Sequence, residues 1–432
     1  MSAFSITHAR SGLLRTLRSV WTRIPERWRF RMWTLAGPRW QSAYARSMIA
    51  RPATHRPSST NAPLVVAGLF STANGIGEAA RTTYRALKAA GLNPIAVDLS
   101  EPFAPVDMTT DIPCEPMPDD AEGTLILQLN GPETMSAMQH LGLELGRNWY
   151  TIGYWAWELP SFPAGWDKAF RYLSELWTIS AFTADALRQN ETTPETHVFG
   201  HAVSPPKGLR TARMKFGWKK DQLVFLTMAD SMSSLERKNP IAAIRAFRAA
   251  FGDDPKRWLV VKTRNLAGSD KAMANLDAAI NDAANIEIMD VSLSDQDKWT
   301  LIMSVDVLVS LHRSEGFGLS LAEAMSLGKP VICTDWSGNM DFTAEINAAL
   351  VRSALVRCHD EYGIYNDKTA YWADPDHEDA VRQLRNVADD PALRKRLATA
   401  GKSQVLGVAS AKGVGKRMAE RLDAIPRKPA AD

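Results

Sequence analysis

The stretch that most constrains the fold of this chain runs from Val307 to Thr334 and reads VLVSLHRSEGFGLSLAEAMSLGKPVICT. Residues 307–312 form a short apolar run rich in β-branched residues, which is typical of a buried parallel strand. Residues 319–327 have helical spacing, and Gly328 ends this helix before the next apolar run. A strand, a turn, a helix and a second strand in this order predict an α/β architecture with a parallel sheet.

The turn of this stretch, Ser314-Glu315-Gly316-Phe317-Gly318, places two glycines around an aromatic residue. Without Cβ atoms the backbone can bend sharply and approach a ligand closely. The start of the following helix leaves N–H donors without partners and carries partial positive charge, which suits a phosphate or a sugar oxygen. We therefore expect Gly316, Phe317, Gly318 and Leu319 to bind substrate.

Two carboxylates frame this turn, Glu315 within it and Glu323 eight positions later. Glu323 lies roughly one helical turn beyond Leu319, so its carboxylate can reach back to a ligand at the helix mouth. A carboxylate accepts several hydrogen bonds and can orient a sugar or a ribose. The alternative is a helix with acidic residues near its start, which the helix dipole would favour without any ligand.

The pair Glu315-x7-Glu323 within EGFGLSLAEAMSLGKPVI resembles the signature of retaining glycosyltransferases that use nucleotide sugars. The resemblance is to glycosyltransferase family 4, which is also called glycosyltransferase group 1. The spacing, both glycines and the closing Gly-Lys-Pro match its motif. The resemblance implies the GT-B fold, which has two facing Rossmann-like domains with parallel sheets and a cleft between them. It also implies that Glu315 lies beside the transferred sugar and that Glu323 holds the ribose of the donor.

Two adjacent cations, Arg237 and Lys238, stand in a loop before a helix that Pro240 opens. They are expected on the same sheet edge as Glu315, where they would suit a diphosphate. A solvated charge cluster is the alternative. The resemblance implies that Lys238, together with Arg237, neutralises the leaving nucleoside diphosphate. Many family members carry a further arginine where Ala229-Asp230 stands here, so one positive charge is missing or is supplied by Arg237.

The N-terminal half begins with an apolar run over residues 64–70 and the loop STANGIGE. Gly75-x-Gly77-x-x-Ala80, followed by a strand that ends in Asp98, imitates the fingerprint of NAD-type enzymes. In that fingerprint the first glycine follows the strand almost directly, whereas several residues intervene here. The family resemblance implies instead that this loop closes over the donor, with Gly75 and Gly77 letting the backbone approach substrate.

The segment GYWAWELP, residues 153–160, stands at the carboxyl end of a predicted strand, where open α/β sheets bind ligands. Many family members have a His-Asp-like pair here that contacts the donor sugar, and this chain has Trp157-Glu158. The departure puts any histidine-assisted step in doubt and makes Glu158 a candidate on the acceptor side. An aromatic core cluster capped by one satisfied acid is the alternative.

A chain of 432 residues is long enough for two domains of ordinary size. We expect four segments: a basic extension over residues 1–60, an acceptor-side domain over 61–204, a nucleotide-sugar domain over 205–408, and a helix over 409–432 that crosses back. None of the histidines or the three cysteines has metal-ligand spacing, and such folds hold phosphate with Lys, Arg and helix dipoles. We therefore expect no metal and no cofactor.

The extension holds eleven arginines against the single acid Glu26, a local charge of +10 in a chain of +3. Four tryptophans lie among them, a mixture that suits an anionic membrane surface. Its apolar runs are too short to span a bilayer, and no signal-peptide core is visible. A role-free extension and an organelle transit peptide are alternatives. Nucleic-acid binding is disfavoured because no folded reader of bases is evident. Three scattered cysteines favour a reducing compartment, so we expect a cytoplasmic protein that can bind peripherally to the inner face of the plasma membrane.

The resemblance implies a retaining transferase that moves a hexose to a saccharide or polyprenyl-linked acceptor. Similarity of the Trp-Glu and Arg-Lys-Asn-Pro segments to enzymes of bacterial surface-polysaccharide assembly, including lipopolysaccharide, favours mannose from GDP-mannose. Glucose or galactose from a UDP-sugar is the alternative. An epimerase, a phosphorylase or a non-catalytic membrane scaffold with the same fold would be more distant. The sequence identifies neither the base and sugar of the donor nor the acceptor.

Overall fold

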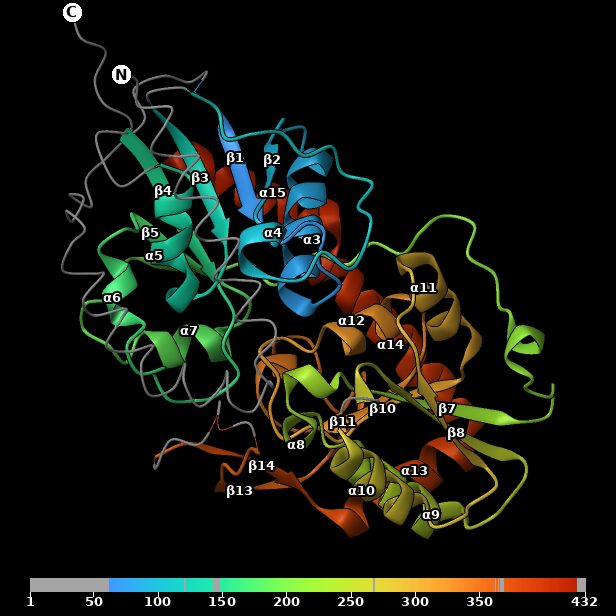
Figure 1. The fold of residues 1–432 in the computed structure, drawn as a ribbon. Helices are drawn as coiled ribbons and strands as arrows, with labels where there is room; N and C mark the ends of the chain where they lie inside the picture. Colours follow the sequence, from blue (N-terminus) through green and yellow to red (C-terminus); the bar gives the residue numbers. More distant parts are fainter. Residues whose placement is uncertain are drawn as a thin grey trace, which may run out of the picture. The chain divides into compact units, whose positions relative to one another are not determined.

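Two parallel β-sheets carry most of the strands in the computed structural model (Figure 1). The structure describes residues 62–119, 122–142, 148–266, 269–361, 363, 365 and 369–425. The arginine- and tryptophan-rich extension over residues 1–60 lies outside the described residues, so its predicted membrane contact stays a prediction. Within the described residues, no helix has both the length and the apolar character needed to cross a bilayer.

The first sheet has the strand order β2-β1-β3-β4-β5-β6, with every neighbouring pair parallel. Its strands are β1 (Leu64–Gly68), β2 (Ile95–Asp98), β3 (Glu122–Gln128), β4 (Asn148–Trp155), β5 (Glu175–Thr178) and β6 (Thr196–Val198). Its helices are α3 (Gly75–Ala89), α4 (Ser100–Phe103), α5 (Gly131–His140), α6 (Asp167–Phe170) and α7 (Ala181–Leu187). Consecutive residues of the central strands, such as Leu125, Ile126 and Leu127, are all inaccessible to solvent, as expected for a sheet covered on both faces.

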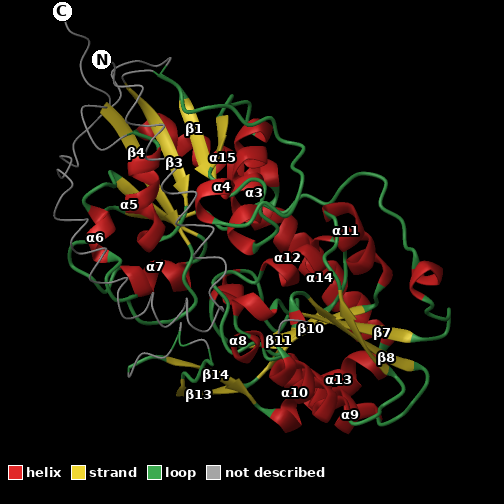
Figure 2. Ribbon diagram, in the orientation of Figure 1, coloured by secondary structure: helices red, strands yellow, loops and turns green. Residues whose placement is uncertain are grey.

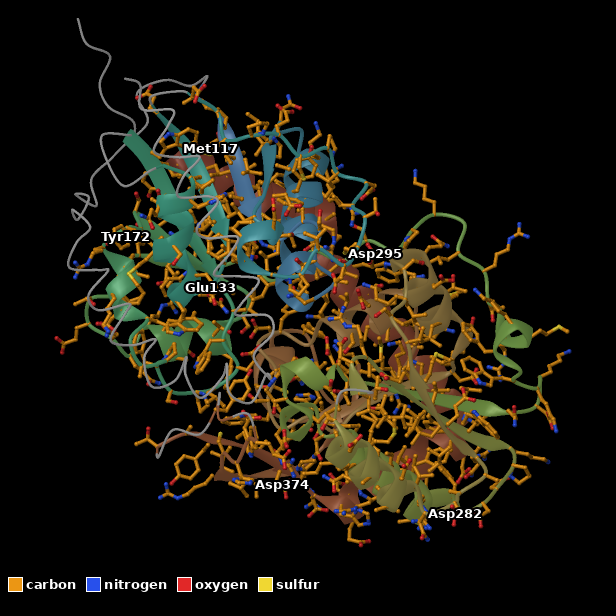
Figure 3. All side chains as sticks on the ribbon, viewed as in Figure 1. Met117, Glu133, Tyr172, Asp282, Asp295 and Asp374 are labelled. Atoms are coloured by element: carbon orange, nitrogen blue, oxygen red, sulfur yellow. The ribbon has the colours of Figure 1, made fainter. Side chains whose placement is uncertain are left out.

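The second sheet has the order β12-β11-β10-β7-β8-β9, also entirely parallel. Its strands are β7 (Leu223–Met228), β8 (Arg257–Thr263), β9 (Ile286–Asp290), β10 (Val307–Ser310), β11 (Val331–Thr334) and β12 (Ala349–Val351). Its helices are α8 (Leu235–Lys238), α9 (Pro240–Phe251), α10 (Asp270–Ile280), α11 (Asp295–Ser304), α12 (Leu319–Ser326), α13 (His377–Asp389) and α14 (Pro391–Ala409). Helices flank the strands of each sheet (Figure 2), and side chains fill the space between them (Figure 3).

The strand order of the second sheet reverses between β7 and β10, which are neighbours although two strands separate them in sequence. The chain leaves β7 toward β8 and β9 on one side, and β10 toward β11 and β12 on the other. At such a switch point the loops after the two central strands part and leave a crevice at their carboxyl ends. The loops after β7 and β10 are those that carry Arg237-Lys238 and Glu315, so the topology itself brings these residues to one place.

Among the described residues, the last helix is α15 (Ala411–Ala424), which packs against α3 of the first sheet. Just before α15, the carbonyl oxygen of Ala409 accepts a hydrogen bond from the Val203 N–H at 2.7 Å. The contact is close, because a Cβ atom on Gly415 would lie 1.9 Å from the carbonyl oxygen of Ala86. Arg421 anchors the end of the helix, its Nη2 lying 2.5 Å from Oε2 of the buried Glu175. The predicted boundaries at residues 60, 204 and 408 stay predictions.

Glu175, Glu195 and His197 bring their oxygen and nitrogen atoms close enough together to hold a metal ion. Arg421 already binds both carboxylates, at 2.5 Å from Glu175 and 3.2 Å from Glu195. We therefore interpret this group as the anchor of α15, with the guanidinium providing the positive charge.

The antiparallel hairpin of β13 (Ser353–Arg357) and β14 (Tyr371–Pro375) was not predicted from the sequence. The sequence pattern predicts a helix from Ala373 onward, and this is wrong at its start because Ala373 pairs with Leu355 in the hairpin. The helix begins only at His377, where the carboxylate of Asp376 accepts a hydrogen bond from the Asp379 N–H at 2.7 Å. An N-cap of this kind fixes the helix start more firmly than apolar spacing does.

Replacing Arg421 with methionine should lower the free energy of unfolding by about 3 kcal/mol, because it leaves the buried Glu175 carboxylate without its cation. Lys416→Met on the same helix is the matched control, since Lys416 pairs with Glu420 in solvent, where both side chains are more than half exposed. Urea unfolding of the two variants and the unmodified chain measures the difference. Equal stability of both variants would show that the Arg421 anchor does not hold α15.

Candidate active site

Arg237 and Lys238 form the last turn of the short helix α8, which the loop after β7 leads into. The Ser234 hydroxyl caps this helix by accepting a hydrogen bond from the Arg237 N–H at 3.2 Å. Asn239 ends it with a left-handed φ of 53° and donates through Nδ2 to the carbonyl of Leu311 at 3.0 Å. This bond ties the end of the cation loop to the loop after β10 and fixes both cations near Glu315.

Glu315 is 7% exposed and lies between the two cations. Its Oε1 is 2.5 Å from Lys238 Nζ, and its Oε2 is 3.4 Å from Arg237 Nη1. Burial alone would raise the pKa of Glu315, but the Lys238 ammonium and the Arg237 guanidinium outweigh it and hold the pKa at about 2. The site therefore holds a fully ionised carboxylate at neutral pH.

The Arg237 guanidinium is buried and makes further bonds, from Nη1 to Ser314 O at 2.8 Å and from Nη2 to Ser233 O at 3.1 Å. Its Nε atom is buried without a hydrogen-bond partner among the described residues. A buried donor without a partner is costly, and an anionic ligand would satisfy it. The guanidinium thus has one donor left over in addition to the charge that it shares with Glu315.

The Glu315 turn is held by the loop after β11, where Ser337 Oγ accepts from Glu315 N at 2.8 Å and Gly338 N donates to Glu315 O at 2.9 Å. Gly318 has a φ of +89° and starts α12. Gly316 has a packing reason to lack a side chain, because a Cβ atom there would lie 2.8 Å from Ile179 Cδ1 of the first sheet. The glycines therefore serve both the turn and the contact between the two halves of the site.

His312 and Phe317 are buried in this structure rather than open to a ligand. The Nε2 atom of His312 lies 3.0 Å from Asn339 Oδ1, and its Nδ1 lies 3.1 Å from Ser310 O. Burial lowers the pKa of His312, which favours a neutral imidazole. The Phe317 ring packs edge-on against His201, with ring centroids 5.1 Å apart. The Phe317 ring therefore belongs to the core.

Trp157 and Glu158 reach the same site from the carboxyl end of β4. The Ser314 hydroxyl donates to the Glu158 carbonyl, and Tyr365 Oη donates to Glu158 Oε2 at 3.2 Å. The Trp157 ring packs 5.1 Å from Trp166 and 5.8 Å from Tyr365, which agrees with an aromatic cluster. The Arg237 guanidinium also lies 5.7 Å from the Tyr365 ring centre, so Glu158 stands next to the cation site.

Sequence reasoning missed Tyr365, which lies between the two strands of the unpredicted hairpin. An aromatic residue in an irregular segment gives no periodic signal. A second link joins the hairpin to the site, since Arg313 Nε and Nη2 donate to Asp374 Oδ1 at 3.0 and 2.9 Å (Asp374 is labelled in Figure 3).

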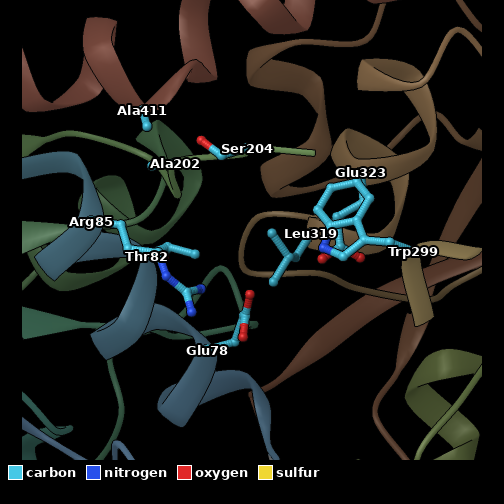
Figure 4. A pocket seen from close by; sticks show the side chains of 9 residues that line it. All are labelled: Glu78, Thr82, Arg85, Ala202, Ser204, Trp299, Leu319, Glu323 and Ala411. Carbon is cyan, nitrogen blue, oxygen red and sulfur yellow. The ribbon is translucent and has the colours of Figure 1, made fainter. Parts of the chain in front are cut away.

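Glu323 lies in a different environment from Glu315, on the wall of a small pocket between α3, α11 and α12 (Figure 4). Lys298 Nζ lies 2.7 Å from Glu323 Oε1. The pocket is lined by side chains from both halves of the described chain: Glu78, Thr82, Arg85, Ala202, Ser204, Trp299, Leu319, Glu323 and Ala411. Leu319 and Glu323, both on α12, thus line the same pocket.

Residues 210–404, which hold Glu315, Glu323 and both cations, match the sequence profile of the family described as glycosyl transferases group 1. This region belongs to the group 1 glycosyltransferases. A search of curated proteins found no match by sequence.

Solved structures of glycosyltransferases share the fold of this glycosyltransferase, although their sequences have diverged. HepE from Anabaena, solved with UDP and glucose, aligns with a TM-score of 0.60 and 13% identity over 84% of this chain and 100% of its own. Sucrose-phosphate synthase from Thermosynechococcus elongatus aligns with a TM-score of 0.60 and 16% identity over 84% and 99% of the two chains. A glycosyltransferase from Rickettsia africae gives a TM-score of 0.59 and 13% identity over the same shares. The two parallel sheets form the GT-B fold that the resemblance implies.

The family resemblance implies an arginine after β7, where this chain has Ala229-Asp230. In the structure, an arginine that follows the neighbouring strand β8 lies beside this position. Arg264 follows β8, and its Nη2 lies 2.5 Å from Oδ2 of Asp230, the residue just after the expected arginine position. A guanidinium thus lies beside Ala229-Asp230, and the Asp230 carboxylate balances its charge. Only the register of β7 on β8 reveals this.

Gly75 and Gly77 lack side chains for different reasons in this glycosyltransferase. The Asn74 side chain caps α3 by accepting from Gly77 N at 2.8 Å, and a Cβ atom on Gly77 would lie 2.2 Å from Thr72 O. A Cβ atom on Gly75 would meet nothing within 4 Å. Asp98, which a dinucleotide enzyme would use for a ribose, accepts bonds from Phe70 N, Ser100 N and Ser100 Oγ instead. The Asp98 side chain therefore joins the end of β2 to the backbone just after β1.

Gly77→Ala should lower the melting temperature, because the added methyl group forces the Thr72 carbonyl away, whereas Gly75→Ala should leave stability unchanged. The two variants add the same methyl group two positions apart, so they control for each other. Thermal unfolding followed by circular dichroism measures the effect. If Gly75→Ala loses sugar transfer while keeping its melting temperature, open space at Gly75 is needed for substrate.

Proposed function

We propose that this glycosyltransferase moves a hexose from a nucleotide sugar to a saccharide or lipid-linked acceptor with retention of configuration. The observation that carries the proposal is the pairing of the buried Glu315 with Lys238 and Arg237 at the switch point of the second sheet. Within the part of the chain that the structure describes, Arg237 Nε has no hydrogen-bond partner. A nucleoside diphosphate brings the negative charge that these cations would bind.

In the proposed reaction, the bond between the anomeric carbon and the diphosphate oxygen breaks. The oxygen of an acceptor hydroxyl forms the new bond to that carbon, and the hydroxyl proton passes to the leaving diphosphate. Lys238, Arg237 and the amides after Phe317 would stabilise the charge on the leaving diphosphate. Glu315 would orient the sugar hydroxyls and stabilise the positive charge at the anomeric carbon. Its low pKa, about 2, keeps it anionic for this role.

Retention would proceed by attack on the face from which the diphosphate leaves. The carboxylates near the site are already engaged, Glu158 with Tyr365 and Glu323 with Lys298, so we assign neither as a covalent nucleophile. Glu323 would bind the donor ribose, and Trp157 with Glu158 would face the acceptor. The reaction as proposed uses no metal or cofactor.

For the donor we propose GDP-mannose, in keeping with the Trp-Glu and Arg-Lys-Asn-Pro segments. A UDP-sugar is the second candidate, favoured by HepE, which has been solved with UDP-glucose. The proposed setting is bacterial surface-polysaccharide synthesis at the cytoplasmic face of the membrane, with residues 1–60 contacting anionic lipid.

A panel of GDP- and UDP-sugars should separate these candidates, because a ligand at one hundred times its dissociation constant stabilises a protein by about 2.7 kcal/mol. We expect GDP-mannose to raise the melting temperature most and to be consumed in proportion to a glycan product. A larger rise with UDP-glucose would select the second donor. Release of an epimer or a sugar phosphate would indicate an epimerase or phosphorylase, and absence of binding by every donor would favour a non-catalytic scaffold.

Lys238→Met and Glu315→Gln should each reduce the transfer rate by about a hundredfold or more, the effect of losing one electrostatic contact to the transition state. The pair Lys271 and Glu361 offers matched controls, since these residues form an ion pair on the surface of the same half. Lys271→Met and Glu361→Gln remove the same groups and should leave transfer unchanged. Full activity of folded Lys238→Met and Glu315→Gln would remove the site assignment.

A further inference from the structure

Four charged side chains form an alternating chain beside the pocket of Figure 4, starting on α3 and ending on α12. Arg81 Nη2 lies 2.8 Å from Glu78 Oε2, and the other oxygen of Glu78 lies 3.8 Å from Lys298 Nζ. Lys298 Nζ in turn lies 2.7 Å from Glu323 Oε1. Glu78 lies on α3 beside the first sheet and Glu323 on α12 beside the second. The Lys298 ammonium is therefore shared between the two halves of the described chain.

These charges are shielded from water, with Arg81 2% exposed, Glu323 3% and Glu78 9%. The Lys298 side chain is 19% exposed and its Nζ lies 5.6 Å from the ring centre of Trp299. The negative charges of Glu78 and Glu323 are balanced by the positive charges of Arg81 and Lys298. A buried charge that loses its partner costs several kcal/mol, so removal of the shared ammonium would leave two carboxylates uncompensated.

The α3 end of the chain is attached to the glycine-containing loop after β1. Arg81 Nη1 donates to the carbonyl oxygens of Phe70 and Thr72, each at 3.0 Å. The same Thr72 carbonyl oxygen lies so close to Gly77 that a Cβ atom there would be 2.2 Å from it. Through Arg81 and Glu78, this loop of the first sheet is therefore connected to Lys298.

At the other end, the Lys298 ammonium opposes protonation of Glu323. Burial raises the pKa of Glu323, and the nearby Glu78 and Asp295 raise it further, while Lys298 opposes them. Arg81, Arg85 and Lys298 act on Glu78 and hold its pKa low despite burial. A protonated Glu323 would accept fewer hydrogen bonds from a diol, so the ammonium keeps the acceptor strength of this acid.

We propose that Lys298 is a positioning residue for the donor. Its ammonium binds the Glu323 carboxylate and orients it toward the donor ribose, and it also pairs with Glu78, so that the loop after β1 stays in place when the donor is bound. This inference rests on the proposed function, in which Glu323 binds the ribose. It adds two residues, Lys298 and Glu78, for which the motifs in the sequence gave no role.

Lys298→Met should therefore weaken binding of the nucleoside diphosphate at neutral pH by tenfold or more and make it recover as the pH rises. The direction follows from the acid: Glu323 is protonated below its pKa, and loss of an opposite charge nearby raises a carboxyl pKa by about 1–3 units. Titration calorimetry of the full chain with UDP and with GDP, from pH 5.5 to 9, measures the profile. The unmodified chain should lose affinity only toward the acidic end of this range.

Two further variants isolate the charge from the packing. Lys298→Arg retains the positive charge and should keep a profile close to that of the unmodified chain. Lys215→Met removes a lysine that pairs with Asp297, the residue before Lys298 on the same helix, but in solvent with its side chain 63% exposed. It should change neither affinity nor profile.

Glu78→Gln tests the link to the first sheet. It leaves the Lys298–Glu323 pair in place, so nucleoside diphosphate affinity should stay within about threefold, while the kcat of sugar transfer should fall by about tenfold, a change equivalent to 1.4 kcal/mol. An unchanged kcat in Glu78→Gln would overturn the proposed link between the two halves.

A folded Lys298→Met variant with unmodified affinity and an unmodified pH profile would overturn the positioning role, and so would a loss of binding that alkaline pH does not restore. Both results leave the proposed function standing, provided that the unmodified chain binds a nucleoside diphosphate and transfers sugar. If the unmodified chain does neither, the proposed function fails first and this inference fails with it. The melting temperature of each variant confirms that it is folded.

Discussion

The ion pairs of Glu315 with Lys238 and Arg237 are the interaction on which the candidate site depends. A carboxylate that is 7% exposed is stable as an anion only because two cations lie within 3.4 Å of it. Those cations come from the loop after β7 and the acid from the loop after β10, and the loops meet because the strand order reverses between these two strands. The electrostatics of the site are therefore a consequence of sheet topology.

The two acids of the motif lie in opposite electrostatic environments, although they are only eight positions apart. Burial acts on both, but two cations hold the pKa of Glu315 at about 2, whereas a single ammonium leaves the pKa of Glu323 raised. Environments that push two neighbouring acids in opposite directions often separate their roles in a reaction. The two acids therefore differ in how readily each takes up a proton.

The site also depends on contacts that the first sheet makes with the second. Ser314 bonds to the Glu158 carbonyl, and the N–H of Ala181 donates to Asp341 Oδ2 at 2.8 Å. The α15 helix strengthens this arrangement by packing on α3, whose first turns carry Gly77 and Glu78. The α15 helix thus supports the helix whose Glu78 lines the pocket of Figure 4.

The sequence by itself determined the features that local spacing encodes. Apolar runs and helical spacing predicted the alternation of strands and helices in both halves, and the motif around Glu315 and Glu323 indicated the family, which the profile match confirms. Arg237 and Lys238 follow a predicted strand, and this position was enough to predict that they lie near Glu315. Each of these predictions needs only short stretches and the rule that parallel strands end at one edge.

Only the tertiary structure decided which distant residues complete the site. Lys298 with Glu78, Tyr365 with Glu158, and Arg264 with Asp230 are pairs that strand register and helix packing bring together, and no periodicity in the sequence relates their members. The hairpin that carries Tyr365 was missed because its strands are short and its pairing is non-local. Charge partners across a fold are set by geometry, so a sequence reveals the charged groups but not which of them meet.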